Sequence, residues 1–184
     1  TYNATADRWV IVGSAGTIAY SDDGIDWTLS SNGTQVFSTF TRGIAYGNNK
    51  WVAVGNGGNG IAYSTDNAVN WTGIGTTIIS AGRAVAYNGT YWVAVGGPVI
   101  AYSTDAINWT TTPTIFTSGN GGEDVQWNGT YWLAVGSGTN NAATSSDSIN
   151  WSSFNLFSNI GYGIGWNGSF WMAVGDDSTN TMKY

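Results

Sequence analysis

One phrase of five residues recurs five times along the 184-residue chain, and this repeat limits the fold more than any other feature. Each copy begins with tryptophan and ends with glycine, and successive copies lie about 40 residues apart: Trp9–Gly13, Trp51–Gly55, Trp92–Gly96, Trp132–Gly136 and Trp171–Gly175. A fixed period of this length is typical of architectures in which each repeat is one supersecondary unit. We therefore expect a single domain, 1–184, of five repeats that cover approximately residues 1–40, 41–81, 82–121, 122–160 and 161–184.

Shorter phrases surround each copy. Ile-Ala-Tyr or a relative of it precedes the copy at 44–46, 85–87, 125–127 and 164–166, with Tyr2-Asn3 as a remnant in the first repeat. A similar phrase follows the copy at 18–20, 61–63, 100–102, 142–144 and 181–184. These phrases are short, rich in β-branched and aromatic residues, and bounded by Gly, Asn, Asp or Ser, which indicates strands and turns.

The Trp-Val-Ala-Val strands are apolar on both faces, so each should be covered on both sides. Asn-Gly pairs at 88–89, 128–129 and 167–168 predict tight hairpins before three of them. Four strands per repeat, covered on both faces, predict an all-β propeller of five four-stranded antiparallel blades. The alternative is a fragment of a six- or seven-bladed ring. The chain begins at Thr1 rather than Met and shows no signal peptide, so we expect a mature, trimmed or excised piece.

The last repeat stops at its third strand, Met182–Tyr184. Its blade is therefore expected to lack the outer strand and to expose an edge with unpaired N–H and C=O groups. We expect this edge either to stay open in a monomer or to be covered by another copy, by another chain, or by residues beyond Tyr184 in a longer polypeptide. Phe37, Phe116 and Phe157 recur before the first strand of a repeat and are expected to plug the loops between blades into the core.

A fourth element, Ser-x-Asp followed by Trp, occurs four times: Ser21, Asp23 and Trp27; Ser64, Asp66 and Trp71; Ser103, Asp105 and Trp109; Ser145, Asp147 and Trp151. The carboxylates are expected to accept the N–H groups of their turns, and the tryptophans to be buried at equivalent places. Metal binding by these carboxylates is the alternative. The element resembles the Asp-box of sialidase-type and related propellers, which lies between the third and fourth strands of a blade.

The Asp-box resemblance covers the whole chain through its four copies, with departures. Three copies are one residue shorter than the usual Ser-x-Asp-x-Gly-x-x-Trp, and the copy Ser64–Trp71 has Ala68 in place of Gly. The resemblance therefore favours the wider Asp-box-like group over an enzyme family inside it. In sialidases it implies an arginine triad, but here Arg8 lies at the opposite strand end from Arg42 and Arg83, and the Phe-Arg-Ile-Pro motif is missing.

The composition of the chain disfavours several classes of partner and of reaction. Only 9% of the residues are charged, and 11 acids outnumber five bases, which disfavours nucleic acids and anionic membranes as partners. No apolar run approaches the roughly 20 residues of a membrane span. The chain has no Cys and no His, which removes nucleophilic triads and the commonest metal ligand. A paired-carboxylate hydrolase using Glu123, Asp124, Asp176 or Asp177 is conceivable, but the spacing does not favour it. We expect no enzyme activity, cofactor or metal.

The position just before the first inner strand varies while its surroundings barely change: it is Arg42, Arg83, Glu123 and Tyr162 in successive repeats. Inner strands line the axis of a propeller, so these residues should ring the mouth of the central channel on one face. They are our candidate ligand-binding residues. The alternative is a set of solvated strand-end residues, including a structural Arg–Glu pair. Asp176-Asp177 is a conceivable calcium site on the same face, or a solvated acidic loop.

These observations predict a non-enzymatic recognition module that binds a glycan, in the manner of a lectin, or a protein. The 11 Trp and 10 Tyr residues invite sugar stacking, but most fall on repeated strand positions and are expected to be core. A structural or assembly component of a surface particle or appendage is the alternative, and a sialidase-like glycosidase is the third candidate. The sparse charge and the Gly-, Asn-, Thr- and Ser-rich composition predict an extracellular, cell-surface or virion-surface location.

Overall fold

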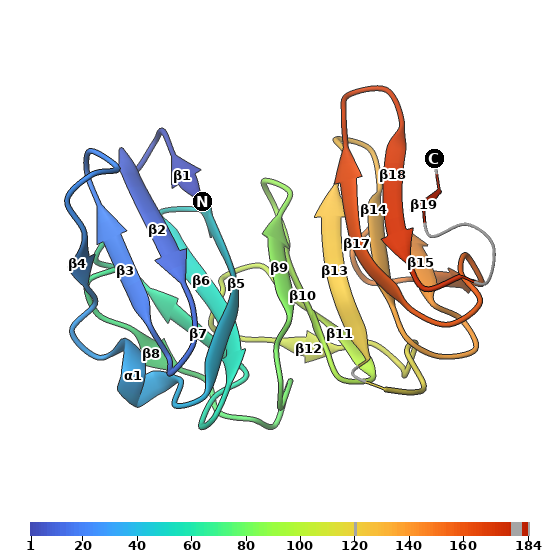
Figure 1. The fold of residues 1–184 in the computed structure, drawn as a ribbon, viewed down its shortest axis with the longest axis horizontal. Coiled ribbons are helices and arrows are strands. Elements are labelled where there is room, and N and C mark those ends of the chain that lie inside the picture. The colour runs from blue at the N-terminus through green and yellow to red at the C-terminus, as the bar shows by residue number, and fades with distance from the viewer. Residues whose placement is uncertain (120, 178–181, 184) are drawn as a thin grey trace.

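The computed structural model of the chain describes residues 1–119, 121–177 and 182–183. Within them it contains five antiparallel sheets, four of four strands and one of three, and a single short helix, α1 (Gly33–Val36). Each sheet consists of consecutive strands, so each repeat forms one blade. The predicted all-β propeller of five blades, with the last blade short of its outer strand, is confirmed (Figure 1).

The first blade contains β1 (Tyr2–Asn3), β2 (Arg8–Val12), β3 (Ile18–Ser21) and β4 (Thr28–Leu29). The second contains β5 (Phe40–Gly47), β6 (Lys50–Asn56), β7 (Ile61–Ser64) and β8 (Thr72–Gly73). The third contains β9 (Ala84–Tyr87), β10 (Trp92–Gly96), β11 (Val99–Ser103) and β12 (Thr110–Thr111). The fourth contains β13 (Gly122–Trp127), β14 (Trp132–Gly136), β15 (Ala142–Ser145) and β16 (Ser152–Phe154). The fifth contains β17 (Gly161–Trp166), β18 (Trp171–Gly175) and β19 (Met182–Lys183).

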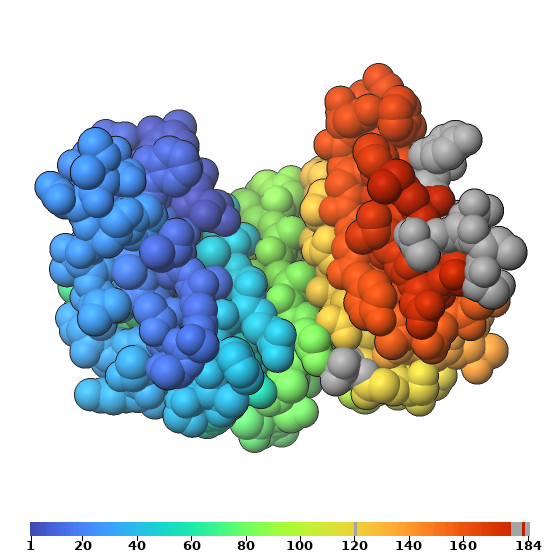
Figure 2. All heavy atoms as spheres, in the orientation of Figure 1, coloured from blue at the N-terminus to red at the C-terminus, as the bar shows by residue number. Residues whose placement is uncertain are grey.

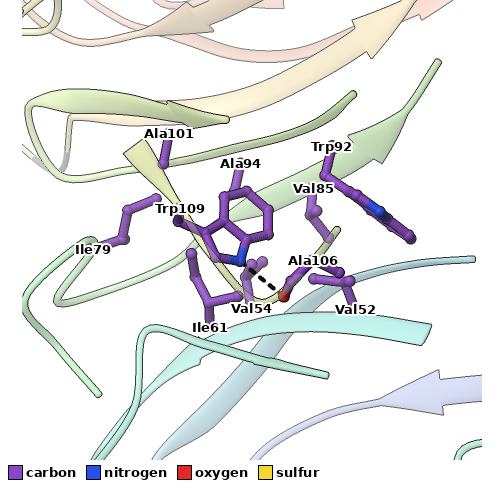
Figure 3. Close-up of a cluster of buried hydrophobic side chains, with 10 residues drawn as sticks. All are labelled: Val52, Val54, Ile61, Ile79, Val85, Trp92, Ala94, Ala101, Ala106 and Trp109. Carbon is purple, nitrogen blue, oxygen red and sulfur yellow. Dashed lines mark hydrogen bonds between the residues drawn. The ribbon is translucent and has the colours of Figure 1, made fainter. Parts of the chain in front are cut away.

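Four hydrophobic clusters fill the four interfaces between successive blades. In the cluster between blades 2 and 3, Val52 and Val54 of β6 meet Trp92 and Ala94 of β10 (Figure 3). The second strand of each blade therefore has a tryptophan face and a valine face. In blades 2–5 the tryptophan face packs on the preceding blade, and in blades 1–4 the valine face packs on the following blade. Phe37, Phe116 and Phe157 are buried in the other three clusters, as predicted: 0%, 0% and 2% of their surface is exposed.

The glycine that ends the recurring phrase is required by a close approach within its own blade. At Gly55 a Cβ atom would collide with the carbonyl oxygen of Phe40, and at Gly136 with that of Gly121. The loop entering the first strand of the blade therefore lies directly on the end of the second strand. Gly13 differs, because nothing lies within 4 Å of its Cβ position. Its blade has only the two-residue β1 at the inner edge, and β1 pairs with Arg8 and Trp9, at the other end of β2 from Gly13.

The five blades form an arc. Blades 1 and 5 lie on opposite sides of an open notch, which is visible between the blue and the orange-red atoms (Figure 2). Adjacent inner strands contact one another in the pairs β5–β9, β9–β13 and β13–β17. The propeller of five blades is thus open on one side in the structure.

Because the ring is open, one of the four tryptophans of the Ser-x-Asp…Trp element is not buried as predicted. Trp71 and Trp109 are buried, with 3% and 8% of their surface exposed, and Trp151 is half-buried. Trp27 is exposed, with 39% of its surface accessible, so its predicted burial is wrong. The reason is its position on the tryptophan face of blade 1, since the structure places no blade before this face. Trp9, on the same face, is 40% exposed for the same reason.

The Ser-x-Asp turns form the hydrogen bonds expected of them. In blade 4, Asp147 Oδ1 accepts the N–H groups of Ile149 and Asn150 at 2.9 and 2.7 Å, and the Asn150 side chain donates to Oδ2 at 2.8 Å. The Asn150 side-chain amide, followed by the two backbone N–H groups, holds the pKa of Asp147 below its usual range. Asp23, Asp66 and Asp105 form related turns. These carboxylates order their hairpins.

Candidate ligand-binding cavity at the inner strands

Backbone irregularities position the four candidate residues. Arg42 lies between Thr41 and Gly43, where the pairing register of β5 with β6 shifts by one residue. Glu123 in β13 and Tyr162 in β17 occupy the same place in equivalent register shifts. Such β-bulges leave one residue outside the ladder and re-aim its side chain. Arg83 directly precedes β9, and its N–H donates to the Val95 carbonyl oxygen at 2.8 Å.

Three of these residues line one cavity. The inner-strand cavity has a volume of about 500 Å³ and is bounded by β2, β5, β9 and β13. Arg42, Arg83 and Glu123 contribute to its wall, together with Asp124. Tyr162 does not line it and is 55% exposed on β17. The structure thus brings together three of the four candidates on adjacent blades.

Arg83 and Glu123 bind each other. Arg83 Nη1 lies 2.9 Å from Glu123 Oε2, and only 18% and 10% of the two side chains are exposed. The pair joins the inner edges of blades 3 and 4. It is the structural Arg–Glu pair that the sequence offered as the alternative interpretation. Removing either partner would leave the other charge nearly buried and uncompensated. The pair therefore acts as a fixed part of the cavity wall.

Arg42 is different, because its guanidinium is exposed. It lies over the Phe40 ring, 4.9 Å from the ring centroid, and in the described part of the chain it forms no ion pair. The cation–π contact orients the side chain but leaves its five N–H donors available. The Arg42 guanidinium in the inner-strand cavity is therefore not neutralised by any carboxylate of the described residues.

Sequence reasoning considered Asp124 only as a hydrolase carboxylate and missed its position. Its carboxylate accepts the N–H of Val125 at 2.8 Å and that of Ile164, in blade 5, at 2.9 Å. Burial raises the pKa of Asp124, although these two hydrogen bonds act in the opposite direction. One signal was visible in the sequence: the equivalent positions in blades 2, 3 and 5 are Gly43, Ala84 and Gly163. An acid in blade 4 thus replaces the small residues that hold this position in the other three blades.

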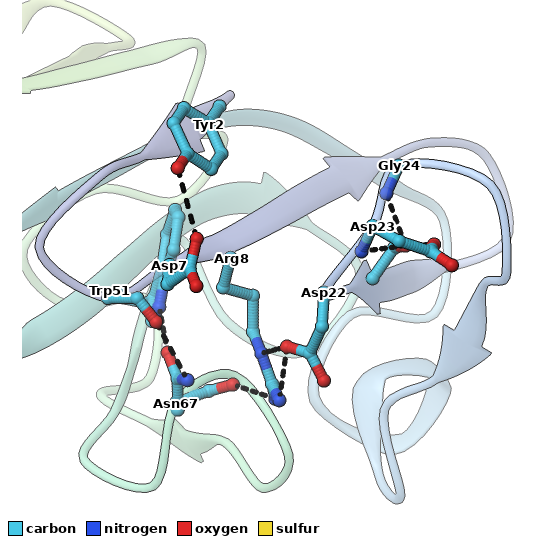
Figure 4. A network of polar contacts seen from close by, with 10 residues as sticks. Tyr2, Asp7, Arg8, Asp22, Asp23, Gly24, Trp51 and Asn67 are labelled. Carbon is cyan, nitrogen blue, oxygen red and sulfur yellow. Dashed lines mark hydrogen bonds and ion pairs between the residues drawn. The ribbon is translucent and has the colours of Figure 1, made fainter.

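The remaining charged candidates lie elsewhere. Arg8 begins β2 and forms an ion pair with Asp22 at 2.7 Å, and its Nη1 donates to the Asn67 carbonyl oxygen at 2.8 Å, which ties blade 1 to blade 2 (Figure 4). It does not line the inner-strand cavity. Asp176 Oδ2 accepts the Asn159 side-chain amide at 2.9 Å.

Asp177 accepts the Ser158 hydroxyl at 2.5 Å. In the parts of the chain that the structure describes, no three acidic residues gather closely enough to hold a metal ion. The same residues include no helix that is long and apolar enough to cross a membrane.

Comparison with known proteins identifies the fold. No protein-family profile and no curated protein matches the sequence. Among solved structures, the chain is similar to the computationally designed Ika8 protein, with a TM-score of 0.63, 11% identity and coverage of 91% of this chain and 52% of that one. It is similar to YCF48 from Cyanidioschyzon merolae, with a TM-score of 0.56, 16% identity and coverage of 89% and 62%.

A third similar structure is the nidogen/laminin complex, with a TM-score of 0.68, 10% identity and coverage of 94% and 69%. The chain thus spans between about half and two thirds of the length of these solved chains. At identities of 10–16% the likeness concerns the arrangement of strands. Together with the sheet topology, it identifies a β-propeller built from repeats.

Proposed function

We propose that the chain is a non-enzymatic recognition module that binds an acidic glycan in the inner-strand cavity. The observation that carries this proposal is the unpaired, oriented guanidinium of Arg42 in a cavity whose wall also includes Glu123 and Asp124. An arginine fork grips a carboxylate or a sulfate through two parallel hydrogen bonds. Carboxylate oxygens accept hydrogen bonds from sugar hydroxyl groups. One cavity thus offers a donor for an acid group and acceptors for neutral hydroxyls.

The size of the inner-strand cavity and its construction also support a ligand site. Its volume of about 500 Å³ falls within the usual range of ligand pockets. Its wall is fixed by the Arg83–Glu123 pair and by the hydrogen bonds of Asp124, so ligand binding need not order these side chains. Preorganisation of this kind reduces the entropy lost on binding. The variable bulge residues lie on a scaffold whose other positions repeat, as expected for a site added to a fold.

A protein ligand is the second candidate. The nidogen chain, which shares this arrangement of strands, was solved in a complex with laminin. An exposed Asp or Glu side chain of a partner would meet Arg42 in the same way as a sugar acid. A structural or assembly role in a surface particle remains the alternative to both. We propose an extracellular, cell-surface or virion-surface setting, which the sparse charge supports.

A glycan array with neutral, carboxylated and sulfated members tests the proposal, using the wild-type chain and two variants. Arg42→Ala removes the unpaired guanidinium from the cavity. Lys50→Ala makes the same change in net charge at the start of β6, outside the cavity. We expect the wild type and Lys50→Ala to bind the same acidic glycans, Arg42→Ala to lose them, and the bound glycans to be recovered uncleaved. Equal binding by all three proteins, or binding of neutral glycans alone, would contradict the proposal.

A further inference from the structure

The fourth and fifth blades enclose a small apolar cavity at their outer interface. Its volume is about 180 Å³, and its wall consists of Tyr131, Leu133, Thr144, Phe154, Leu156, Trp171 and Ala173. The Tyr131 hydroxyl accepts the indole N–H of Trp171 at 2.9 Å, so the polar groups of these two side chains are paired with each other. We call it the indole slot, for the reason given below. It is separate from the inner-strand cavity, which contains none of these residues.

The repeat identifies what occupies the same place in other blades. By strand register, Ala173 is equivalent to Ala94, Trp171 to Trp92, and Leu133 to Val52. At the interface between blades 2 and 3, these equivalent residues belong to the cluster that encloses the indole of Trp109 (Figure 3).

Trp71 fills the corresponding place between blades 1 and 2, and Trp151 packs between blades 3 and 4. Each of these indoles comes from the residue directly before the outer strand of the later blade. In blade 5 the structure describes no such strand, since its sheet has the order β17-β18-β19. The slot between blades 4 and 5 therefore lacks the indole that its counterparts contain.

The exposure of the wall agrees with an unfilled slot. The tryptophans at the equivalent position in blades 2, 3 and 4 are fully buried: Trp51, Trp92 and Trp132. Trp171 in blade 5 is only half-buried. Phe154 is 39% exposed. Both side chains belong to the slot, and both would lose solvent contact if an aromatic ring entered it.

The polar chemistry of the occupant also follows from the other blades. Trp71 Nε1 donates to the Ala68 carbonyl oxygen at 3.2 Å, and Trp109 Nε1 donates to the Ala106 carbonyl oxygen at 2.9 Å. In each case the acceptor lies three residues before the tryptophan, in the turn of the same hairpin. An occupant of this kind brings its own acceptor, so an apolar slot suffices to receive it.

We propose that the indole slot receives a tryptophan carried by an extended segment outside residues 1–184, which adds to β19 as the fourth strand of blade 5. Main-chain hydrogen bonds to a free edge would supply affinity, and the side-chain pocket would supply specificity, as in other cases of strand addition. The occupant should resemble the chain's own outer hairpin: a Ser-x-Asp turn, a tryptophan, and then a short strand of Thr or Ser.

The probe for this proposal is a labelled synthetic peptide that copies residues 103–112, which contain the turn, Trp109 and β12. Its fluorescence anisotropy is measured against the 184-residue chain. We expect saturable binding that weakens about tenfold or more when the tryptophan of the peptide is replaced by alanine, as for other anchor residues. This comparison needs no change in the protein. Absence of binding at millimolar concentration, or equal binding of both peptides, would overturn the proposal.

Protein variants locate the binding site. Ala173→Leu fills the indole slot and should abolish binding of the peptide, whereas Met172→Ala, on the opposite face of β18, should leave it unchanged. N-acetyltryptophanamide should bind far more weakly than the peptide, and equal affinity would refute the added strand. Sedimentation velocity over a range of concentrations tests a second copy as the occupant. Self-association that the peptide does not displace would count against the slot as the contact.

Discussion

Replacing Ala106 with serine should stabilise the protein, because it supplies a hydrogen-bond acceptor that one buried tryptophan lacks. Two tryptophans of the recurring phrase donate their indole N–H to the turn of their own blade: Trp51 Nε1 to Asn67 Oδ1 at 3.1 Å and Trp132 Nε1 to Ser148 Oγ at 2.8 Å. Trp92 Nε1 is buried and has no partner among the described residues. The residue equivalent to Ser148 in its blade is Ala106, which has no side-chain acceptor.

The backbone at Ala106 is already suited to serine. Its φ is 68°, and that of Ser148 is 69°. The backbone N–H groups of Ala106 and Ser148 also form the same hydrogen bond. Each donates at 3.0 Å to the hydroxyl of the serine that begins its turn, Ser103 or Ser145. A serine at 106 should therefore place its hydroxyl near Trp92 Nε1 without added backbone strain.

The expected gain follows from the cost of the missing bond. An unsatisfied buried donor costs roughly 1–3 kcal/mol, and an average hydrogen bond contributes about 1 kcal/mol net. We expect Ala106→Ser to raise the free energy of unfolding by about 1 kcal/mol, which corresponds to a Tm higher by about 2–4 °C in a domain of this size. The reverse change in blade 4, Ser148→Ala, should lower stability by about 1–3 kcal/mol.

Urea unfolding followed by far-UV circular dichroism measures both changes without relying on indole fluorescence. A double comparison is informative because the two substitutions affect equivalent tryptophans in neighbouring blades. If Ala106→Ser leaves the free energy of unfolding unchanged or lowers it, the reasoning from blade equivalence fails for this turn.

Three further predictions concern the scaffold. Trp109→Ala should cost about 3–5 kcal/mol, whereas Trp27→Ala, in the same motif but 39% exposed, should cost much less; equal losses in urea unfolding would contradict the open arc. Gly136→Ala should lower the free energy of unfolding by about 1–3 kcal/mol, and with it the Tm, because the added methyl group overpacks the site. Gly13→Ala should change both little, since no atom lies within 4 Å of its Cβ position. Because hydrogen bonds lower the pKa of Asp147 in the folded protein, its contribution to stability is present above about pH 4 and is lost as the pH falls. Asp147→Asn should therefore flatten the decline of the free energy of unfolding between neutral and acid pH. An unchanged slope would be the contrary result.

Repetition made most of the fold predictable from the sequence. The spacing of the tryptophan phrase predicted the number of blades, and the Asn-Gly pairs and the Ser-x-Asp elements predicted the turns. These features depend on local chemistry within a repeat, so one correct interpretation applied to every copy. The same reasoning failed for Trp27, because its burial depends on a neighbouring blade rather than on its own motif.

The candidate site was predictable only in part. The change of residue type at one repeated position predicted Arg42, Arg83 and Glu123, which the structure brings to one cavity. The pairing of Arg83 with Glu123 was one of two interpretations that the sequence left open, and the structure decides for it because the two side chains meet across the interface between blades 3 and 4. Asp124 was missed because its importance depends on reaching the Ile164 N–H across the next interface.

The most direct test of our central claim, that ligands bind in the inner-strand cavity, is a two-dimensional ¹H–¹⁵N NMR titration with the acidic glycan that binds best on the array. The account predicts that the largest shift changes fall on the amides of residues 42–44, 83–85 and 123–124, on three neighbouring blades. Arg42→Ala should abolish these changes while the rest of the spectrum stays the same. Changes confined to the outer strands or to the Ser-x-Asp turns would contradict the claim.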